Sequence, residues 1–155
     1  MSLLQQYNVW ELADLPPNRK AVSCKWVFAA KLDANGCVHT HKARLVARGF
    51  CQKYGKDYDK TYAPVVIHNT VRVLLSVAAA KELHVRQLDV KSVYLNGHLD
   101  EEIYIEQLPG FVTKGSEHKV CHLLKSIYGL KQSALIWNCR ATEALTKMGF
   151  LSKCS

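Results

Sequence analysis

The residue with the most specific chemistry in this chain is Asp89, which lies in the segment QLDVKSVYLNG at positions 87–97. The segment at 85–88 is strand-like, so we predict that the carboxylate lies at the edge of a buried strand. Asn96 and Gly97 then mark a turn. A carboxylate at such a point can bind a divalent cation, but a single acid cannot supply the several oxygen ligands that the ion needs.

The remaining acids and metal-binding residue types do not complete a set around Asp89. The acids at 100–102 follow the turn, and we interpret them as a solvated loop directed away from Asp89. No two aspartates are adjacent in the sequence. The pair His39 and His41 lacks a third ligand at metal spacing, and no cysteine pair has the C-x-x-C spacing of a zinc site. The residues therefore predict no complete metal site.

The composition favours a folded protein with a polyanionic partner. Lys and Arg number 21 against 13 Asp and Glu, giving a net charge of +8, although a basic surface without a partner is the alternative. The N-terminus lacks the features of a signal peptide, and no apolar run approaches the ~20 residues of a membrane span. We expect an intracellular protein, cytoplasmic or nuclear and not secreted, with reduced cysteines and no membrane partner.

The hydrophobic pattern predicts a mixed, α+β fold. Helices are expected at 69–82 and 134–147, the second one ending at the capping residue Gly149. The sequence Asn35-Gly36 predicts a hairpin. Strands are expected at 24–33, 37–50, 85–93, 101–107 and 119–124.

Three basic residues within the expected strand at 37–50 could bind phosphate groups. Lys42, Arg44 and Arg48 lie two and four positions apart, so an extended strand would put all three on one face. Arg and Lys neutralise phosphate charge, which makes this face a candidate nucleic-acid or nucleotide surface. The alternative interpretation is a solvated strand face.

Five segments, in this order, resemble the reverse-transcriptase domain of the Ty1/copia class of retrotransposons. They are KWVFAAKLDANG (25–36), HKARLVARGFCQKYGKDYDKTYAPVV (41–66), TVRVLLSVAA (70–79), QLDVKSVYLNGHLDEEIYIEQLPGF (87–111) and VCHLLKSIYGLKQSALIWN (120–138). The resemblance implies a right-hand polymerase fold, with residues 1–84 and 108–132 in the fingers and residues 85–107 and 133–155 in the palm. It also implies that the chain ends before the family's Tyr-x-Asp-Asp hairpin and thumb.

The resemblance implies a metal-dependent catalytic role for Asp89. Asp89 would be a catalytic residue and a ligand of Mg²⁺, and the backbone carbonyl of Val90 would be a further ligand. The family's other two carboxylates come from the Tyr-x-Asp-Asp hairpin, which this sequence lacks. The catalytic set is therefore expected to be incomplete in this chain.

The resemblance also implies a set of substrate-binding residues. Tyr94 would lie under the sugar of the incoming deoxynucleotide and exclude a 2′-hydroxyl, although without the resemblance an aromatic residue here is read as plain core. Lys42 and Arg44 would bind the RNA or DNA template-primer or the nucleotide. Gln132, in the segment YGLKQ, would lie near the template and the incoming nucleotide.

We therefore interpret the chain as part of a retrotransposon RNA-directed DNA polymerase that uses two-metal nucleotidyl transfer and is inactive alone. One alternative is a non-catalytic basic module that binds nucleic acid and derives from a transposon. Another is that a second polypeptide supplies the missing aspartates. The sequence leaves the oligomeric state open.

Overall fold

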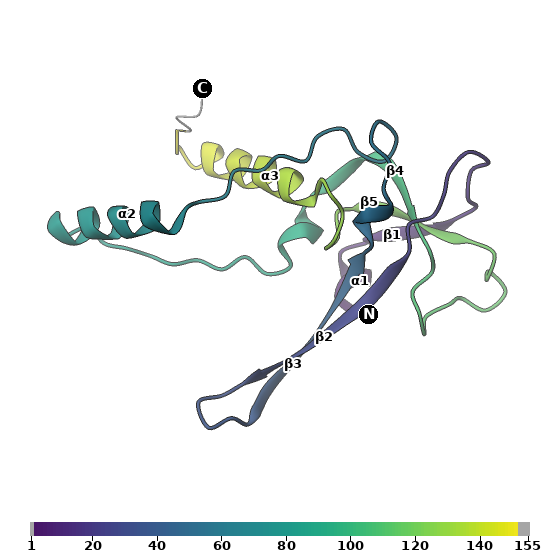
Figure 1. The fold of residues 1–155 in the computed structure, drawn as a ribbon, viewed down its shortest axis with the longest axis horizontal. Helices are drawn as coiled ribbons and strands as arrows, with labels where there is room; N and C mark the ends of the chain where they lie inside the picture. Colours follow the sequence, from purple (N-terminus) through teal and green to yellow (C-terminus); the bar gives the residue numbers. More distant parts are fainter. Residues whose placement is uncertain (1, 152–155) are drawn as a thin grey trace.

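The computed structural model describes residues 2–151, in which helices and antiparallel strands are mixed (Figure 1). The helices are α1 (Ser2–Gln6), α2 (His68–Ala80) and α3 (Ser133–Lys147), with the short 3-10 helices η1 (Gly49–Cys51) and η2 (Val93–Asn96). The strands are β1 (Trp10–Ala13), β2 (Cys24–Leu32), β3 (Val38–Ala47), β4 (His98–Ile105) and β5 (Val120–Lys125). This mixture confirms the α+β class, whereas the division into fingers and palm stays a prediction.

Strands β2 and β3 form a two-stranded antiparallel ribbon that projects away from the other sheet (Figure 1). At its tip, Asp33 Oδ1 accepts hydrogen bonds from the backbone N–H groups of Asn35 and Cys37, each at 2.9 Å. Gly36 has a left-handed φ of +79°, a conformation that glycine adopts without steric cost. The predicted hairpin is therefore confirmed, and a side-chain acceptor holds its turn.

The main core lies on a second sheet with the strand order β1-β5-β4, in which all pairs are antiparallel. Ile103 and Ile105 share one face of β4 and are 1% and 0% exposed, and Leu123 of β5 is 1% exposed. Full burial of one such side chain contributes about 1.5–3 kcal/mol. The same core contains Cys121, and burial raises the pKa of its thiol to about 11. We conclude that this sheet is the best-packed part of the described chain.

The connection between β5 and α3, taken together with the first residue of α3 as residues 126–133, is where the ribbon is fixed to the rest of the molecule. Gly129 has φ of +90°, and a Cβ atom there would lie 2.1 Å from the carbonyl oxygen of Ala47. A Cβ atom at Gly49 would lie 2.1 Å from the carbonyl oxygen of Gly129. The Ala47 N–H donates to the carbonyl of Tyr128 at 2.8 Å. Because Gly49 and Gly129 have no side chains, the backbone at the end of β3 can contact the backbone of this connection directly.

Helix α2 and its extended flanking segments stand apart from both sheets (Figure 1). The helix predicted at 69–82 is confirmed, but none of its residues is buried. Val73 and Leu74 of its apolar side are 61% and 63% exposed. No helix within residues 2–151 is long and apolar enough to cross a bilayer.

Helix α3 agrees with its predicted bounds and its predicted cap. Gly149 has φ of +90°, and its N–H donates to the carbonyl of Thr146 at 2.9 Å. The N–H of Phe150 donates a hydrogen bond to the carbonyl of Leu145 at 3.0 Å. These bonds satisfy carbonyls that the end of the helix would otherwise leave unpaired.

The strand expected at 85–93 is wrong. Residues 83–90 are extended but form no strand pairing within the described chain, and residues 91–92 form a turn before η2. A strand needs a neighbour to satisfy its backbone N–H and C=O groups, and local sequence does not reveal whether one is present. The apolar pattern at 85–88 therefore produced an exposed extended segment.

One further expectation near this segment is corrected by the structure. The acids at 100–102 lie in β4 and not in a loop, and Glu102 accepts a hydrogen bond from Arg19 at 3.3 Å. The turn predicted at Asn96 and Gly97 is present at the end of η2, where the Gly97 N–H donates to the carbonyl of Tyr94 at 3.0 Å. Gly97 is needed there because a Cβ atom would lie 2.4 Å from Ile136 Cγ2. The short elements α1 and β1 were not predicted.

Candidate functional site

A cleft of about 870 Å³ opens between the ribbon and the segment that carries Asp89. Its lining residues come from α1, from both strands of the ribbon, from η2 and from three connections: Leu3, Leu4, Gln6, Tyr7, Trp26, His41, Lys42, Ala43, Arg44, Leu45, Asp89, Val90, Lys91, Ser92, Val93, Leu95, Ile127 and Tyr128. Four residues of the predicted site, Lys42, Arg44, Asp89 and Val90, therefore line one cleft. Tyr94 and Gln132 do not line it.

The basic wall of the cleft is formed by alternate residues of β3. Lys42 and Arg44 share a face, as predicted, whereas Arg48 follows the end of the strand and leaves that face. Lys31 of β2 lowers the pKa of Lys42, first through a side-chain hydrogen bond and then through charge repulsion, and Arg44 acts in the same direction. Asp89 acts in the opposite direction on this pKa, and it lines the same cleft as Lys42. An anionic ligand would relieve the repulsion among the basic groups.

Tyr128 connects the basic wall to η2. The guanidinium carbon of Arg44 lies 5.7 Å from the centroid of the Tyr128 ring, within the range of a cation–π contact. The Tyr94 ring meets the same ring edge to face, with centroids 4.7 Å apart and an interplanar angle of 74°. Tyr94 therefore packs against Tyr128, and Tyr128 contacts the Arg44 side chain.

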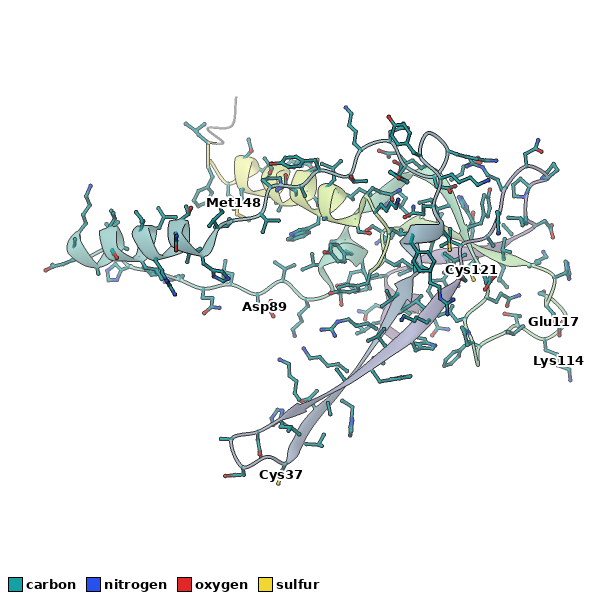
Figure 2. All side chains as sticks on the ribbon, viewed as in Figure 1. Cys37, Asp89, Lys114, Glu117, Cys121 and Met148 are labelled. Atoms are coloured by element: carbon teal, nitrogen blue, oxygen red, sulfur yellow. The ribbon has the colours of Figure 1, made fainter. Side chains whose placement is uncertain are left out.

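Asp89 is exposed and lies on the thin connection between α2 and the rest of the molecule (Figure 2). This connection begins and ends at residues with a left-handed backbone conformation, since Glu82 and Ser92 each have φ of +52°. The Asn96 side-chain amide donates to the carbonyl of Ser92 at 3.3 Å, which holds the second of these bends. The bend at Ser92 therefore determines the direction in which the Asp89 segment leaves the body.

The described residues do not form a Mg²⁺ centre by themselves. Residues 2–151 contain no group of three or more His, Cys, Asp or Glu side chains that could hold a metal ion. Asp89 offers one carboxylate and Val90 one backbone carbonyl, whereas Mg²⁺ demands a near-octahedral shell of oxygen ligands. The donor set is therefore too small for the ion that the sequence suggested.

Gln132 lies outside the cleft in a buried contact with the loop that follows β3. Its side chain is 1% exposed, and it receives a hydrogen bond from Gln52 Nε2 at 3.1 Å. Its own amide nitrogen donates to the carbonyl of Asp57 at 2.8 Å. The substrate contact predicted for Gln132 would require these bonds to be exchanged for bonds to a ligand.

Sequence reasoning missed two residues that shape the site. Tyr128 lies in the segment YGLKQ, but only Gln132 of that segment was given a role. Gln52 was given none, because nothing in the local sequence distinguishes a buried amide from a solvated one. In addition, the Trp26 indole N–H is buried in the cleft wall and has no hydrogen-bond partner within residues 2–151.

A mixed α+β chain with a basic cleft that faces an exposed carboxylate is suited to binding a phosphate-bearing ligand. The family model described as reverse transcriptase (RNA-dependent DNA polymerase) matches residues 7–154. The chain belongs to this reverse transcriptase family. The resemblance identified from the five sequence segments is therefore confirmed.

Particular relatives are Pol polyproteins of plant transposons. The chain is 47% identical over 137 residues to the retrovirus-related Pol polyprotein from transposon TNT 1-94 of Nicotiana tabacum, covering 88% of this chain. It is 40% and 38% identical over 149 residues to the corresponding polyproteins from transposons RE2 and RE1 of Arabidopsis thaliana, covering 96% of this chain. The chain spans 10% of the length of each of these relatives. No solved structure gives a significant match.

Proposed function

We propose that this chain supplies the substrate-facing cleft and the first catalytic carboxylate of a retrotransposon RNA-directed DNA polymerase. The observation that carries the proposal is the meeting of Lys42, Arg44 and Asp89 in one cleft. The basic pair would bind phosphates of the RNA or DNA template-primer or of a deoxynucleotide. We also propose that the protein acts inside the cell, because the template that it would copy is located there.

Asp89 is proposed to act together with carboxylates from outside residues 2–151. In nucleotidyl transfer of this class, a pair of divalent metal ions stabilises the attacking and leaving oxygens. Asp89 and the Val90 carbonyl could contribute two ligands to such a pair, but they are too few to hold it. The isolated chain is therefore proposed to be catalytically inactive.

Tyr94 is proposed to exclude the 2′-hydroxyl of a ribonucleotide. Its ring packs edge to face on the Tyr128 ring, and Tyr128 lines the cleft. A bulky aromatic pair there would narrow the space available to the sugar. A smaller side chain at 94 should therefore admit ribonucleotides more readily.

Binding to an RNA–DNA template-primer tests the cleft directly. Fluorescence anisotropy at increasing salt should show log K falling linearly with log salt. The double variant Lys42→Ala, Arg44→Ala should reduce the slope by roughly two. The matched control Lys81→Ala, Lys114→Ala removes the same charge at two exposed lysines outside the cleft. Equal slopes for the two double variants would contradict the proposed cleft.

Primer extension tests the catalytic part of the proposal. Residues 7–154 would replace the matching segment of the tobacco relative, and the chimera would copy an RNA template. The change Asp89→Asn should lower extension about 100-fold or more, because it removes a charged ligand from the reacting centre. The control Asp100→Asn changes an acid of β4 that does not line the cleft and should leave extension unchanged. An active chimera that tolerates Asp89→Asn would refute the catalytic assignment.

A further inference from the structure

Two glutamine side chains are buried where the loop after β3 meets residues 126–133. Gln52 is 5% exposed and Gln132 is 1% exposed. Gln52 Oε1 accepts a hydrogen bond from the backbone N–H of Lys131 at 2.8 Å, and Gln52 Nε2 donates to Gln132 Oε1 at 3.1 Å. Gln132 Nε2 then donates to the carbonyl of Asp57 at 2.8 Å. Both ends of each amide are therefore bonded to protein.

The direction of this chain of hydrogen bonds is fixed at both ends. The backbone N–H of Lys131 can only donate, so Gln52 must present its oxygen there and its nitrogen to Gln132. The carbonyl of Asp57 can only accept, so Gln132 must present its nitrogen there. If either side-chain amide were rotated by 180°, two donors or two acceptors would lie opposite each other. A substitution that removes one donor therefore breaks the chain.

The amide chain contacts residues 131–132 of the same connection that contributes Ile127 and Tyr128 to the cleft. Tyr128 lies four residues before Gln132 in residues 126–133. Ser133 Oγ donates to the carbonyl of Ile127 at 2.6 Å, which ties the two ends of this connection together. A shift of the connection away from the loop after β3 would therefore move the Tyr128 ring.

We infer that Gln52 and Gln132 are positioning residues that hold Tyr128 beneath the Arg44 guanidinium. The inference rests on the proposed function, since the direction of Arg44 matters to phosphate binding only in such a cleft. It gives Gln132 a role different from the substrate contact predicted from the sequence. A buried amide with both ends bonded to protein acts on the cleft through Tyr128, whereas a substrate-binding amide would need a free donor or acceptor.

The change Gln52→Glu tests the direction of the hydrogen-bond chain. An ionised carboxylate still accepts from Lys131 but cannot donate to Gln132. At pH 8 the full chain carrying this change should bind the template-primer about tenfold more weakly, with a salt slope reduced by roughly one because Arg44 leaves its phosphate contact. A loss of stability alone would weaken binding without changing the slope of the folded protein. The control Gln5→Glu makes the same chemical change at an exposed position.

Acidification should restore the salt slope of the Gln52→Glu variant. A protonated carboxyl group has one acceptor and one donor, as the amide has, and burial raises the pKa of such a group. The slope of Gln52→Glu should return to that of the unmodified chain as the pH falls toward 5. A slope that stays reduced in acid would indicate that the amide acts only through packing and would overturn the inference.

A second readout does not depend on any ligand. The Arg44 side-chain N–H resonance should carry a ring-current shift from Tyr128, identified by its loss in Tyr128→Leu. Gln52→Glu should lose this shift at pH 8 and regain it in acid. If the unmodified chain binds no template-primer, the proposed function fails, yet this NMR measurement still decides whether the glutamines position Tyr128.

The change Gln132→Ala separates positioning from direct contact with a ligand. If Gln132 is a positioning residue, the variant should lose the Arg44 ring-current shift, and its salt slope should fall by roughly one as in Gln52→Glu. Weaker binding with an unchanged ring-current shift would show that Gln132 contacts the ligand itself. That result would overturn the inference.

Discussion

Two parts of this molecule differ in how far their side chains are packed: the packed body, formed by β1, β4, β5 and residues 126–133, and the arm, residues 62–90, which contains α2. Ile105 of the body is 0% exposed, whereas Leu88 of the arm is 88% exposed. The arm carries many large apolar side chains in solvent: Tyr62, Val65, Val66, Ile67, Val71, Val73, Leu74, Leu75, Val77, Leu83, Val85, Leu88 and Val90.

The difference separates two components of one site. Tyr128 belongs to the body and contacts Arg44, and the Ala47 N–H donates to the Tyr128 carbonyl, so the basic wall of the cleft is attached to the packed body. Asp89 belongs to the arm, and few packed side chains restrict it. The structure thus combines a basic wall attached to the body with a carboxylate whose position depends on an unpacked segment.

Hydrogen exchange should show the largest contrast between the two parts. Helix α2 has 13 residues and buries none, and isolated helices of this length are marginal in water. Its amides should open at a cost of only about 1 kcal/mol, whereas amides of β5 should open only with global unfolding, at about 5 kcal/mol or more. Exchange followed by NMR or mass spectrometry measures both. Comparable protection would mean that the arm is packed in solution.

Truncation of a core side chain should have the next largest effect. Ile105→Ala should lower the free energy of unfolding by about 2–5 kcal/mol, since it leaves a cavity in a filled core. Leu74→Ala on α2 is the matched control, and it should change stability by less than about 0.5 kcal/mol. Urea denaturation measures both. A large cost for Leu74→Ala would show that the arm contributes to the cooperative unit.

Substitution of the glycine at the backbone crossing should have a moderate effect. Gly129→Ala would bring a Cβ atom to 2.1 Å from the Ala47 carbonyl oxygen, and it also strains a left-handed residue. Gly110→Ala shares the positive φ, at +83°, but meets nothing within 4 Å, so it isolates the cost of the conformation alone. We expect Gly129→Ala to cost about 2 kcal/mol more than this control. Equal costs in urea denaturation would mean that the crossing relaxes freely.

The electrostatic link between arm and body should give the smallest effect. Asp89 raises the pKa of Lys42 against the stronger lowering by Lys31, so Asp89→Asn should lower the pKa of Lys42 further below its ordinary value. NMR titration of the Lys42 side-chain ammonium measures this shift, with Asp100→Asn as the control. An unchanged pKa in Asp89→Asn would show that the arm does not keep Asp89 beside the ribbon.

The elements that local sequence predicted are those whose signals lie within the element. The Asn35-Gly36 turn set the ribbon, and Gly149 set the end of α3. The segment before Asp89 had the same apolar character as a strand, yet strand formation depends on a partner that local sequence does not reveal. The sequence therefore predicted which segments are extended or helical better than it predicted which are packed.

The candidate site was predicted in part for a similar reason. Lys42 and Arg44 followed from alternation along one strand, and Asp89 from a motif with a family resemblance. Gln52 and Tyr128 depend on contacts with residues about 80 positions away in the chain, as between Gln52 and Gln132. Such contacts leave no periodic or local signal, so the structure was needed to find them.

The left-handed backbone bend at Ser92 determines the direction of the short segment before it. Two residues, Val90 and Lys91, separate Ser92 from Asp89, so Asp89 can lie at most roughly 10 Å from the bend. A rotation of about 20° at the bend would swing the carboxylate by roughly 3 Å, more than the length of a metal–oxygen bond. A single dihedral angle at Ser92 therefore affects where the Asp89 carboxylate lies relative to the cleft.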